Sequence, residues 1–243
     1  MSALTNTDIV ILAGGLGRRL SAVTGGKQKV LARINGKPFL SLLIEYIASQ
    51  GGRRFILCTG HGAGQVEEHI VGAHPELEIL FSREEEPLGT GGAIKKGASL
   101  VNSDQFLAMN GDCFCVIDYN RLIEFHRACK AQATLAITRV EDAREYGTIE
   151  IDTHKHISAF KEKQPQAVSA FINTGTYCFD RNVFGLVVTP AKFSIEYDFF
   201  PHLVGHNFFA FEVENKFIDI GTPERYAWAQ EHLKTLCRGS GPI

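Results

Sequence analysis

The chain has 243 residues, so at about 150 residues per domain it forms one large domain or a core domain with an elaborated edge. Hydrophobic residues make up 44% and charged residues 21% of the sequence, which excludes a disordered, collagen-like or coiled-coil chain. The 25 lysines and arginines against 27 aspartates and glutamates give a net charge of −2. No global positive field therefore favours nucleic acid, and any site for a polyanion must be local.

The N-terminal residues and the cysteines predict a cytoplasmic protein without a membrane partner. The first residues carry no basic segment, and the longest early apolar run, 9–13, is far shorter than the roughly 20 residues that span a bilayer. The six cysteines include no Cys-x-x-Cys pair, which is typical of reduced thiols rather than of a disulfide scaffold.

The first half of the chain alternates short β-rich runs with longer amphipathic ones. This pattern requires crossover helices and predicts a doubly wound α/β fold with a parallel sheet. The expected strands are 8–12, 54–59, 77–82 and 105–110, and the expected helices are 39–50, 64–70 and 91–101. Ligands of such sheets bind at the carboxyl ends of strands, so we expect the site after Leu12, Ser82 and Asn110.

The second half of the chain is less regular. Its patterns predict helices at 119–131 and 222–234, strands at 133–140 and 217–220, and a hairpin at 148–161 around the polar turn 152–156. No internal repeat or linker separates the halves. We therefore expect a single domain over 1–243, with halves at 1–112 and 113–236 and a tail at 237–243.

A glycine-rich loop with two arginines, LAGGLGRRL (12–20), follows the first expected strand. Gly14, Gly15 and Gly17 allow a tight turn and a close approach to a ligand, and Arg18 and Arg19 suit phosphate. The loop is neither a GxGxxG nor a P-loop motif, and glycines alone are typical of any tight strand-to-helix turn. The two arginines favour phosphate binding over that simpler interpretation.

Three lysines follow this loop in the segment 27–38. Lys27, Lys29 and Lys37 would each be a solvated surface lysine in most proteins. Their short distance from the glycine-arginine loop predicts a local cradle for a polyphosphate.

Two later motifs also follow expected strands. In EPLGTGGAI (86–94), Pro87 and Gly89 open the loop, while Gly91 and Gly92 let a planar ligand or a packed helix come close. In NGD (110–112), the carboxylate of Asp112 suits Mg²⁺, which prefers oxygen ligands. An Asx turn is the alternative interpretation of NGD.

Other conspicuous residues are interpreted as structural. His154 and His156 lie in the polar turn without a third ligand nearby in sequence, which favours a solvated hairpin over a metal site. Cys113 and Cys115 are expected to pack or to line a cleft. Trp228 and the aromatic residues of 199–211 are expected in the core or at a contact between subunits of a homodimer.

Together with FIDIGTPERY (217–226), these motifs resemble, in order, those of the sugar-1-phosphate nucleotidyltransferases, from residue 8 to about 233. The resemblance implies a Rossmann-like, mixed and mostly parallel sheet flanked by helices, with a smaller β-rich sugar-binding elaboration and no left-handed β-helix. It places the nucleotide in the half 1–112 and the sugar phosphate in the half 113–236. The reaction implied joins a nucleoside triphosphate to a sugar 1-phosphate and releases pyrophosphate.

The resemblance also assigns roles to residues at matching positions. Catalysis would rest on Arg18, Lys29 and Asp112, and Asp112 and Asp219 would hold Mg²⁺. The nucleotide would be bound by Leu12, Ala13, Gly14, Gly15, Gly17, Arg18, Pro87, Gly89, Thr90, Gly91 and Gly111, and the sugar phosphate by Tyr146, Gly147, Glu162, Lys163, Asn173 and Gly175. One departure concerns Gln28, which stands where the family usually has a proline before the lysine.

Within the family, the motifs PLGTGGAI, YGTIEID, FKEK, NTGTY and FIDIGTPERY are most similar to those of bacterial D-glycero-D-manno-heptose 1-phosphate guanylyltransferases. This implies GTP as the nucleotide and a GDP-sugar for surface polysaccharide as the product. PLGT also occurs in mannose-1-phosphate guanylyltransferases, the alternative substrate class.

Two hypotheses from other functional classes compete with that of a nucleotidyltransferase. A non-catalytic regulatory protein that binds nucleotide sugars would have little need for both Asp112 and Asp219. A retaining glycosyltransferase would be expected to carry an Asp-x-Asp triplet, which the sequence lacks.

Overall fold

The computed structural model of the chain describes residues 2–15, 20, 25, 28–161, 169–214 and 217–236. The strands of its main sheet are β1 (Asp8–Leu12), β4 (Arg54–Thr59), β5 (Glu78–Arg83), β6 (Gln105–Asn110), β8 (Ala133–Val140), β9 (Thr148–Ile151), β10 (Ile157–Lys161), β11 (Ala170–Asp180) and β12 (Phe208–Val213). The α-helices are α2 (Phe39–Ser49), α3 (Ala63–Ala73), α4 (Gly89–Ala98), α5 (Tyr119–Ala128), α6 (Phe200–Leu203) and α7 (Pro223–Leu236). Shorter elements are β2 (Arg33–Ile34), β3 (Lys37–Pro38), β7 (Cys113–Cys115), β13 (Phe217–Asp219), the 3-10 turns η1 (Ala3–Asn6), η2 (Lys29–Leu31) and η3 (Val183–Gly185), and the π-turn η4 (Ile195–Phe199).

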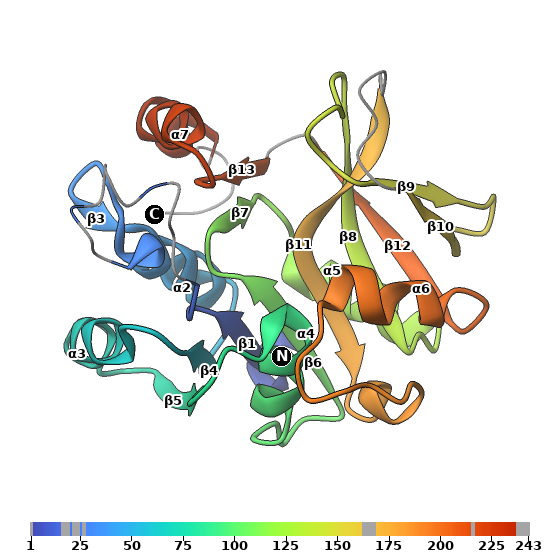
Figure 1. Cartoon of the computed structure of the whole chain (residues 1–243), viewed down its shortest axis with the longest axis horizontal. Helices are drawn as coiled ribbons and strands as arrows, with labels where there is room; N and C mark the ends of the chain where they lie inside the picture. The colour runs from blue at the N-terminus through green and yellow to red at the C-terminus, as the bar shows by residue number, and fades with distance from the viewer. Residues whose placement is uncertain are drawn as a thin grey trace.

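The main sheet is mixed and runs through both halves of the chain (Figure 1). Its order is β10-β9-β11-β6-β1-β4-β5, and β8 and β12 extend it from the other edge of β11. Strands β6, β1, β4 and β5 pair in parallel, whereas β11 is antiparallel to β6, β8 and β9. Of the nine strands described in this sheet, seven therefore point the same way, and β10 and β11 run against them.

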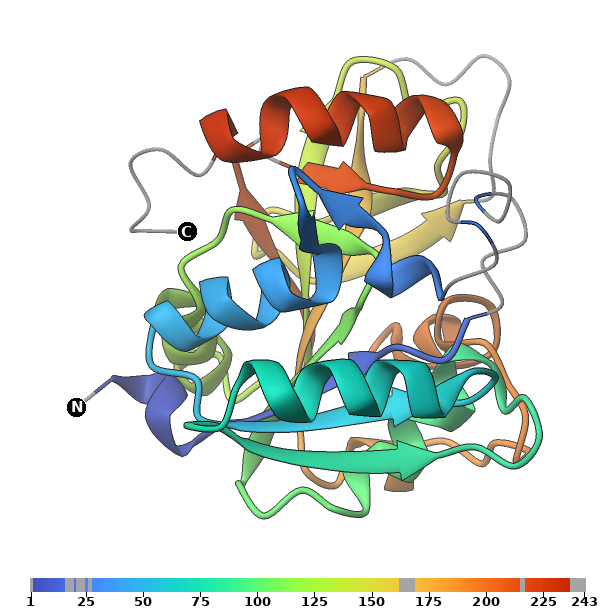
Figure 2. The same ribbon diagram turned by 90° about the vertical axis from the view of Figure 1, so that its left-hand side faces the viewer.

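Helices cover both faces of this sheet because the parallel strands are apolar on both sides. Ile9 and Ile11 of β1 pack in one core cluster with α2, α3 and α5, while Val10 packs in a second cluster with α4 and α6. Figure 2 shows α7, α2 and α3 one above the other along the first side. The carboxyl ends of β1, β4, β5 and β6 meet at one edge of the sheet, where the loops that follow them gather.

The predicted α/β class and most of the expected elements are confirmed, but two strands of the sheet were not anticipated. Strand β11 contains the polar run 173–176, and β12 was interpreted only as part of an aromatic stretch. β11 lies between β6 and β8, so the sheet continues across the expected division at residue 112. The aromatic residues Phe199, Phe200 and Phe208 are in the core, as expected.

The outer helix α7 bears on the expectation for Trp228. Trp228 is 45% exposed and stacks on His232, so it does not lie in the core; the alternative, a contact between subunits, stays a prediction. Instead, Gln230 of α7 binds the hairpin of β2 and β3, since its side-chain amide donates to the Arg33 carbonyl and accepts from the Asn35 amide. In the part of the chain that the structure describes, every helix is too short or too polar to cross a bilayer.

A buried ion pair at the opposite end of β1 from the loops gives a test of stability. Asp8 is 4% exposed; it accepts from Arg54 Nη1 at 2.7 Å and from the amides of Asn102 and Ser103. Burial raises the pKa of Asp8, but the hydrogen bonds from Arg54 and the two amides outweigh it and hold the pKa below its usual 3.8. The stabilisation is thus full above pH 3.8 and is lost as the pH falls through the lower, folded-state pKa.

We expect Asp8→Asn to lower the free energy of unfolding by about 2–4 kcal/mol at pH 7, because it leaves Arg54 without its buried partner. The difference from the wild type should shrink below pH 3.8, as urea unfolding at several pH values would measure. Glu78→Gln, which removes the exposed partner of the same arginine, is the control and should cost less than about 1 kcal/mol. A loss that does not vary with pH would contradict the assignment.

Candidate active site

Two cavities lie at the carboxyl ends of the parallel strands, and they meet. The first, of about 440 Å³, is lined mostly by residues after 112. The second, of about 640 Å³, is lined by residues up to 112. Lys29, Asn110 and Asp112 line both cavities, so ligands in the two would meet at these three side chains.

The wall of the second cavity comes from loops that follow three strands of the sheet. After β1 come Gly14 and Gly15, after β4 come Gly60 and His61, and after β5 comes the segment 84–90. Of the residues expected to bind a nucleotide, those that line this cavity are Leu12, Gly14, Gly15, Pro87, Gly89 and Thr90. Sheet topology thus brings together motifs that are up to about eighty residues apart in sequence.

Three other residues expected to bind the nucleotide make close contacts within the protein. A Cβ at Gly91 would lie 2.2 Å from the Phe193 ring, and one at Gly111 would lie 2.4 Å from the Leu12 carbonyl oxygen. The amide of Ala13 already donates to the Cys58 carbonyl at 2.8 Å. The described lining of the cavity includes none of the three, and their roles in nucleotide binding stay predictions.

The charged groups on the second cavity are mainly acidic among the described residues. Glu84, Glu85, Glu86 and Asp112 face it with Lys29 as their cationic counterpart. Lys37 does not join them, because it pairs with Glu45 at 2.5 Å on the surface, so the expectation that it belongs to a phosphate cradle is wrong.

Several expected site residues lie outside the part that the structure describes. They are Gly17, Arg18, Arg19, Lys27, Glu162 and Lys163. Their roles stay predictions from the sequence.

Lys29 and two aspartates form the junction between the cavities. Lys29 Nζ pairs with Asp112 Oδ2, and a Cβ at Gly221 would lie 3.7 Å from the same ammonium group. Asp219 stands opposite Cys113, the residue after Asp112, in the antiparallel pair of β7 and β13. The amide of Ile220 donates to the Asp112 carbonyl at 3.0 Å. Asp112, which directly precedes β7, and Asp219, the last residue of β13, therefore lie at the same side of the cleft.

Gln28 gives Lys29 a tether in place of the proline that the family usually has. Its Nε2 donates to the His61 carbonyl, and the side chain is 7% exposed. It packs against Gly62, which has a φ of +71° and where a Cβ would lie 2.4 Å from Gln28 Nε2. The residue before Lys29 is thus joined to a loop of the second cavity by a hydrogen bond rather than stiffened by a ring.

The first cavity carries the residues expected to bind a sugar phosphate. Tyr146, Gly147, Asn173 and Gly175 all line it. Asn173 Nδ2 donates to the Tyr177 hydroxyl at 2.9 Å and to Glu196 Oε1 at 2.8 Å, while its Oδ1 accepts from the Gly175 amide. The side chain of Asn173 is thereby held in one orientation at the cavity wall.

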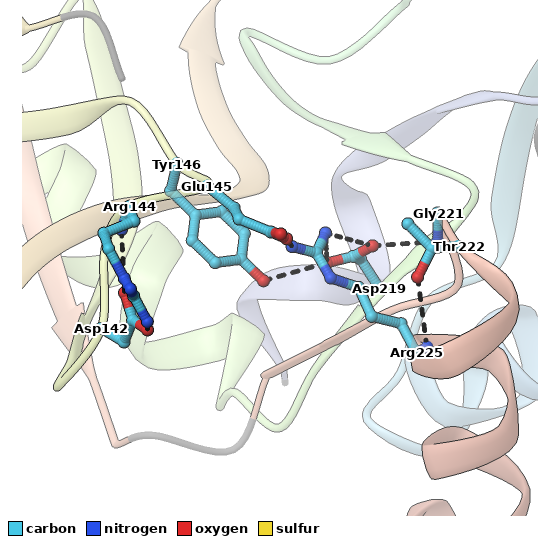
Figure 3. Close-up of polar contacts among 8 residues, drawn as sticks. All are labelled: Asp142, Arg144, Glu145, Tyr146, Asp219, Gly221, Thr222 and Arg225. Carbon is cyan, nitrogen blue, oxygen red and sulfur yellow. Dashed lines mark hydrogen bonds and ion pairs between the residues drawn. The ribbon is translucent and has the colours of Figure 1, made fainter. Parts of the chain in front are cut away.

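Arg225 joins the two sides of this cavity. As Figure 3 shows, its guanidinium group lies between Asp219, Glu145 and the ring of Tyr146. Nη1 donates to both oxygens of Asp219, at 3.0 and 2.9 Å, and Nη2 pairs with Glu145. The Tyr146 hydroxyl also donates to Asp219, at 3.3 Å.

Two protonated side chains flank this cluster. Burial, followed by the Asp219 charge, raises the pKa of Tyr146 to about 12. Burial and the charges of Asp112 and Asp219 raise the pKa of the Cys113 thiol well above its usual value. Tyr146 is thus a neutral donor at physiological pH, and Cys113 lines the cavity as an unreactive thiol, in line with its structural interpretation.

Sequence reasoning missed Asn110, Glu196 and Arg225, all of which line the first cavity. Asn110 is the first residue of the NGD motif and Arg225 belongs to FIDIGTPERY, so both stood inside recognised motifs. No sequence pattern distinguishes Glu196.

Gly175 allows β11 to bend at the cavity. The register of β11 against β8 shifts between Asn173 and Tyr177, and Gly175 has a φ of +73°. A Cβ there would lie 2.6 Å from Asn110 Nδ2.

We expect Gly175→Ala to lower the free energy of unfolding by about 1–3 kcal/mol, because alanine is strained at this φ and collides with Asn110. Urea denaturation measures the change. Gly72→Ala in α3, where nothing lies within 4 Å, is the control and should leave stability unchanged or raise it by up to about 1 kcal/mol. Equal stabilities of Gly175→Ala and the wild type would contradict this account of the bend.

Asp112 and Asp219 supply carboxylate oxygens, which are the ligands that Mg²⁺ prefers. No group of three or more His, Cys, Asp or Glu side chains that could hold a metal gathers in the described ranges. Two carboxylates fit Mg²⁺ nonetheless, since this ion commonly takes one or two carboxylates and completes its shell with water and phosphate oxygens.

The chain is similar in sequence to two groups of curated enzymes. It is 36% identical, over 93% of its length and 98% of the relative's, to D-glycero-alpha-D-manno-heptose 1-phosphate guanylyltransferase of Aneurinibacillus thermoaerophilus. It is 34% identical, over 99% of its length and 67% of the relative's, to mannose-1-phosphate guanylyltransferase of Mycobacterium tuberculosis.

The fold is similar to that of a solved structure, and a family model matches most of the chain. The crystal structure of HddC from Yersinia pseudotuberculosis complexed with GMP-PN superposes with a TM-score of 0.82 at 37% identity, over 93% of this chain and 99% of HddC. Residues 8–235 match the nucleotidyl transferase family. The chain belongs to this family of enzymes, which confirms the resemblance drawn from its motifs.

Proposed function

We propose that the protein is a guanylyltransferase that joins GTP to a sugar 1-phosphate, releases pyrophosphate and yields a GDP-sugar. The observation that carries this proposal is that the two cavities meet at Lys29, Asn110 and Asp112. The nucleotide occupies the second cavity and the sugar phosphate the first. Their phosphates then meet at the junction, where the bond forms.

In the proposed reaction, an oxygen of the sugar 1-phosphate attacks the α-phosphorus of GTP, and the bond to pyrophosphate breaks. The attacking oxygen is already anionic, so no general base is needed. The protein has to align two polyanions and neutralise charge on the transferring and leaving groups. Lys29 lies at the junction of the two cavities, where the phosphates of both substrates meet, and is suited to contact the transferring phosphoryl group. Arg18 is proposed to act with it from the glycine-rich loop.

Mg²⁺, held by Asp112 and Asp219, would neutralise phosphate charge and help to orient the triphosphate. Without it, the described junction carries two aspartates against Lys29 and Arg225. A bound cation would also offset the acidic side chains among the described lining residues of the second cavity.

Guanine as the base is supported by the relatives and by the chemistry of the second cavity. Guanine presents N1–H and N2–H₂ donors, which need acceptors. The carboxylates of Glu84, Glu85 and Glu86 line the cavity and offer such acceptors. Glu84 is held in place, since its Oε2 accepts from the Leu88 amide at 2.8 Å.

We propose D-glycero-D-manno-heptose 1-phosphate as the sugar substrate, because the heptose relative is matched over nearly its whole length. Mannose 1-phosphate is the second candidate, supported by the similar mannose-specific relative. The GDP-heptose would supply bacterial surface polysaccharide, such as capsule. We also propose a cytoplasmic location. Reduced thiols are expected there, and the five described cysteines are free. A homodimer stays a prediction.

The test is a pyrophosphate-release assay with Mg²⁺, five nucleoside triphosphates (GTP, ATP, UTP, CTP and dTTP) and the two sugar 1-phosphates. We expect release with GTP and the heptose phosphate, at a kcat/KM at least about tenfold above that of any other pair. Turnover with mannose 1-phosphate alone would replace the heptose assignment. Binding of nucleotide sugars without pyrophosphate release from any pair would favour a regulatory protein and contradict the enzymatic proposal.

A further inference from the structure

The carboxylate of Asp219 has its hydrogen-bonding capacity filled by protein donors. Oδ1 accepts from Arg225 Nη1 at 3.0 Å and from the Gly221 amide at 2.9 Å. Oδ2 accepts from Arg225 Nη1 at 2.9 Å and from the Tyr146 hydroxyl at 3.3 Å. A carboxylate offers about four lone-pair positions, so a divalent ion at Asp219 must displace a donor.

Arg225 is the donor that can leave. The Gly221 amide belongs to the backbone of the turn before α7, and Tyr146 is a neutral group that a metal-bound carboxylate tolerates. Arg225 instead carries a full positive charge, which a divalent ion on the same carboxylate would repel. Its side chain is 27% exposed, whereas that of Asp219 is 11% exposed.

The contacts of Arg225 allow its side chain to move while its backbone stays in place. Its backbone is anchored in the first turn of α7, where the amide donates to Thr222 Oγ1 at 3.3 Å. Nη2 pairs with Glu145, whose side chain is 74% exposed, and the guanidinium carbon lies 4.8 Å from the Tyr146 ring centroid. These two contacts can hold the guanidinium group near the first cavity after it leaves Asp219 (Figure 3).

We propose that Arg225 is a positioning residue that occupies Asp219 in the free protein and exchanges this carboxylate for the phosphate of the sugar 1-phosphate. Arginine suits this exchange because its planar fork binds carboxylate and phosphate in the same bidentate way. The exchange frees Asp219 for the divalent ion, so binding of the sugar phosphate and of the ion are coupled through one side chain. The inference rests on the proposed function, which puts the sugar phosphate in the first cavity.

The proposal makes the two affinities of an Arg225→Gln variant change in opposite directions. Without substrates, the variant should bind the divalent ion more tightly than the wild type, because nothing charged competes for Asp219. It should bind the sugar 1-phosphate more weakly, because the fork that receives the phosphate is gone. If Arg225 merely held Asp219 in position, both affinities would fall.

The experiment measures Mn²⁺ binding to the full chain without substrates by electron paramagnetic resonance, and KM for each substrate in the coupled assay. For Arg225→Gln we expect a Kd for Mn²⁺ lower by about 5-fold or more and a KM for the sugar 1-phosphate higher by a similar factor, with KM for GTP unchanged. Arg144→Gln is the matched control, because this neighbouring arginine pairs with Asp142 outside both cavities. It should change none of these values.

An equal or higher Kd for Mn²⁺ in Arg225→Gln would overturn the proposal. Arg225→Lys provides a second test if the glutamine variant fails to fold. It keeps a cation at Asp219 but loses the fork, so Mn²⁺ affinity should stay near the wild type while KM for the sugar 1-phosphate rises; an unchanged KM would also overturn it. Asp219→Asn tests the proposed metal site separately from the exchange by Arg225. Unaltered Mn²⁺ binding in that variant would show that Asp219 is not a ligand of the ion.

Discussion

Replacing Lys29 with methionine is expected to lower kcat/KM by about 10²- to 10³-fold, with both substrates still binding. Lys29 Nζ lies at the junction of the two cavities, so it can contact the transferring phosphoryl group, whose charge grows in the transition state. Methionine keeps most of the length and the apolar stem of the side chain but removes the charged ammonium group. Steady-state kinetics with GTP and the sugar 1-phosphate measure the loss.

Lys37→Met is the matched control for this experiment. Lys37 comes from the same lysine-rich segment but pairs with Glu45 outside both cavities. Its removal should leave kcat/KM within about twofold of the wild type, because surface pairs of this kind contribute little. Comparable activities of Lys29→Met and Lys37→Met would show that Lys29 has no part in the chemistry.

Replacing Asp112 with asparagine is expected to lower kcat by about 10³-fold or more and to raise the Mg²⁺ concentration needed for half-maximal rate. The amide is neutral, so it binds a hard cation poorly and leaves the Lys29 ammonium without its partner. Activity as a function of Mg²⁺ concentration measures both effects.

Asp118→Asn is the control for the aspartate. Asp118 caps α5 by accepting from the Arg121 amide at 3.0 Å, and asparagine caps helices about as well. This variant should keep wild-type kinetics. An Asp112→Asn enzyme with an unchanged Mg²⁺ dependence would contradict the role of Asp112 as a metal ligand, whatever its kcat.

In the parallel half of the fold, the sequence predicts the first and last residues of several strands correctly. β1, β4 and β6 begin and end where expected, because each is an apolar run bounded by polar or glycine residues. β11 was missed because its segment 173–176 is polar and contains Gly175, which together are typical of a turn. Only the pairing of β11 with both β6 and β8 makes this segment part of a strand.

Motifs likewise predict some residues of the site, whereas the roles of others can be seen only in the structure. Lys29, Asp112 and Asp219 were placed together by resemblance, and the structure brings them to one junction. Glycine serves close packing and ligand approach alike, and only coordinates show that the Phe193 ring lies where a Cβ at Gly91 would be. Arg225 escaped notice because an arginine in the first turn of an outer helix is typically solvated.

The measurement that tests the account most directly is a crystal structure of the protein with the GDP-sugar product. We predict guanine against 84–87 in the second cavity, the sugar beside Tyr146 and Asn173 in the first, and the diphosphate at Lys29 and Asp112. A product with its diphosphate away from Lys29, or with sugar and base in the opposite cavities, would contradict the proposed joining of two ligands at this junction.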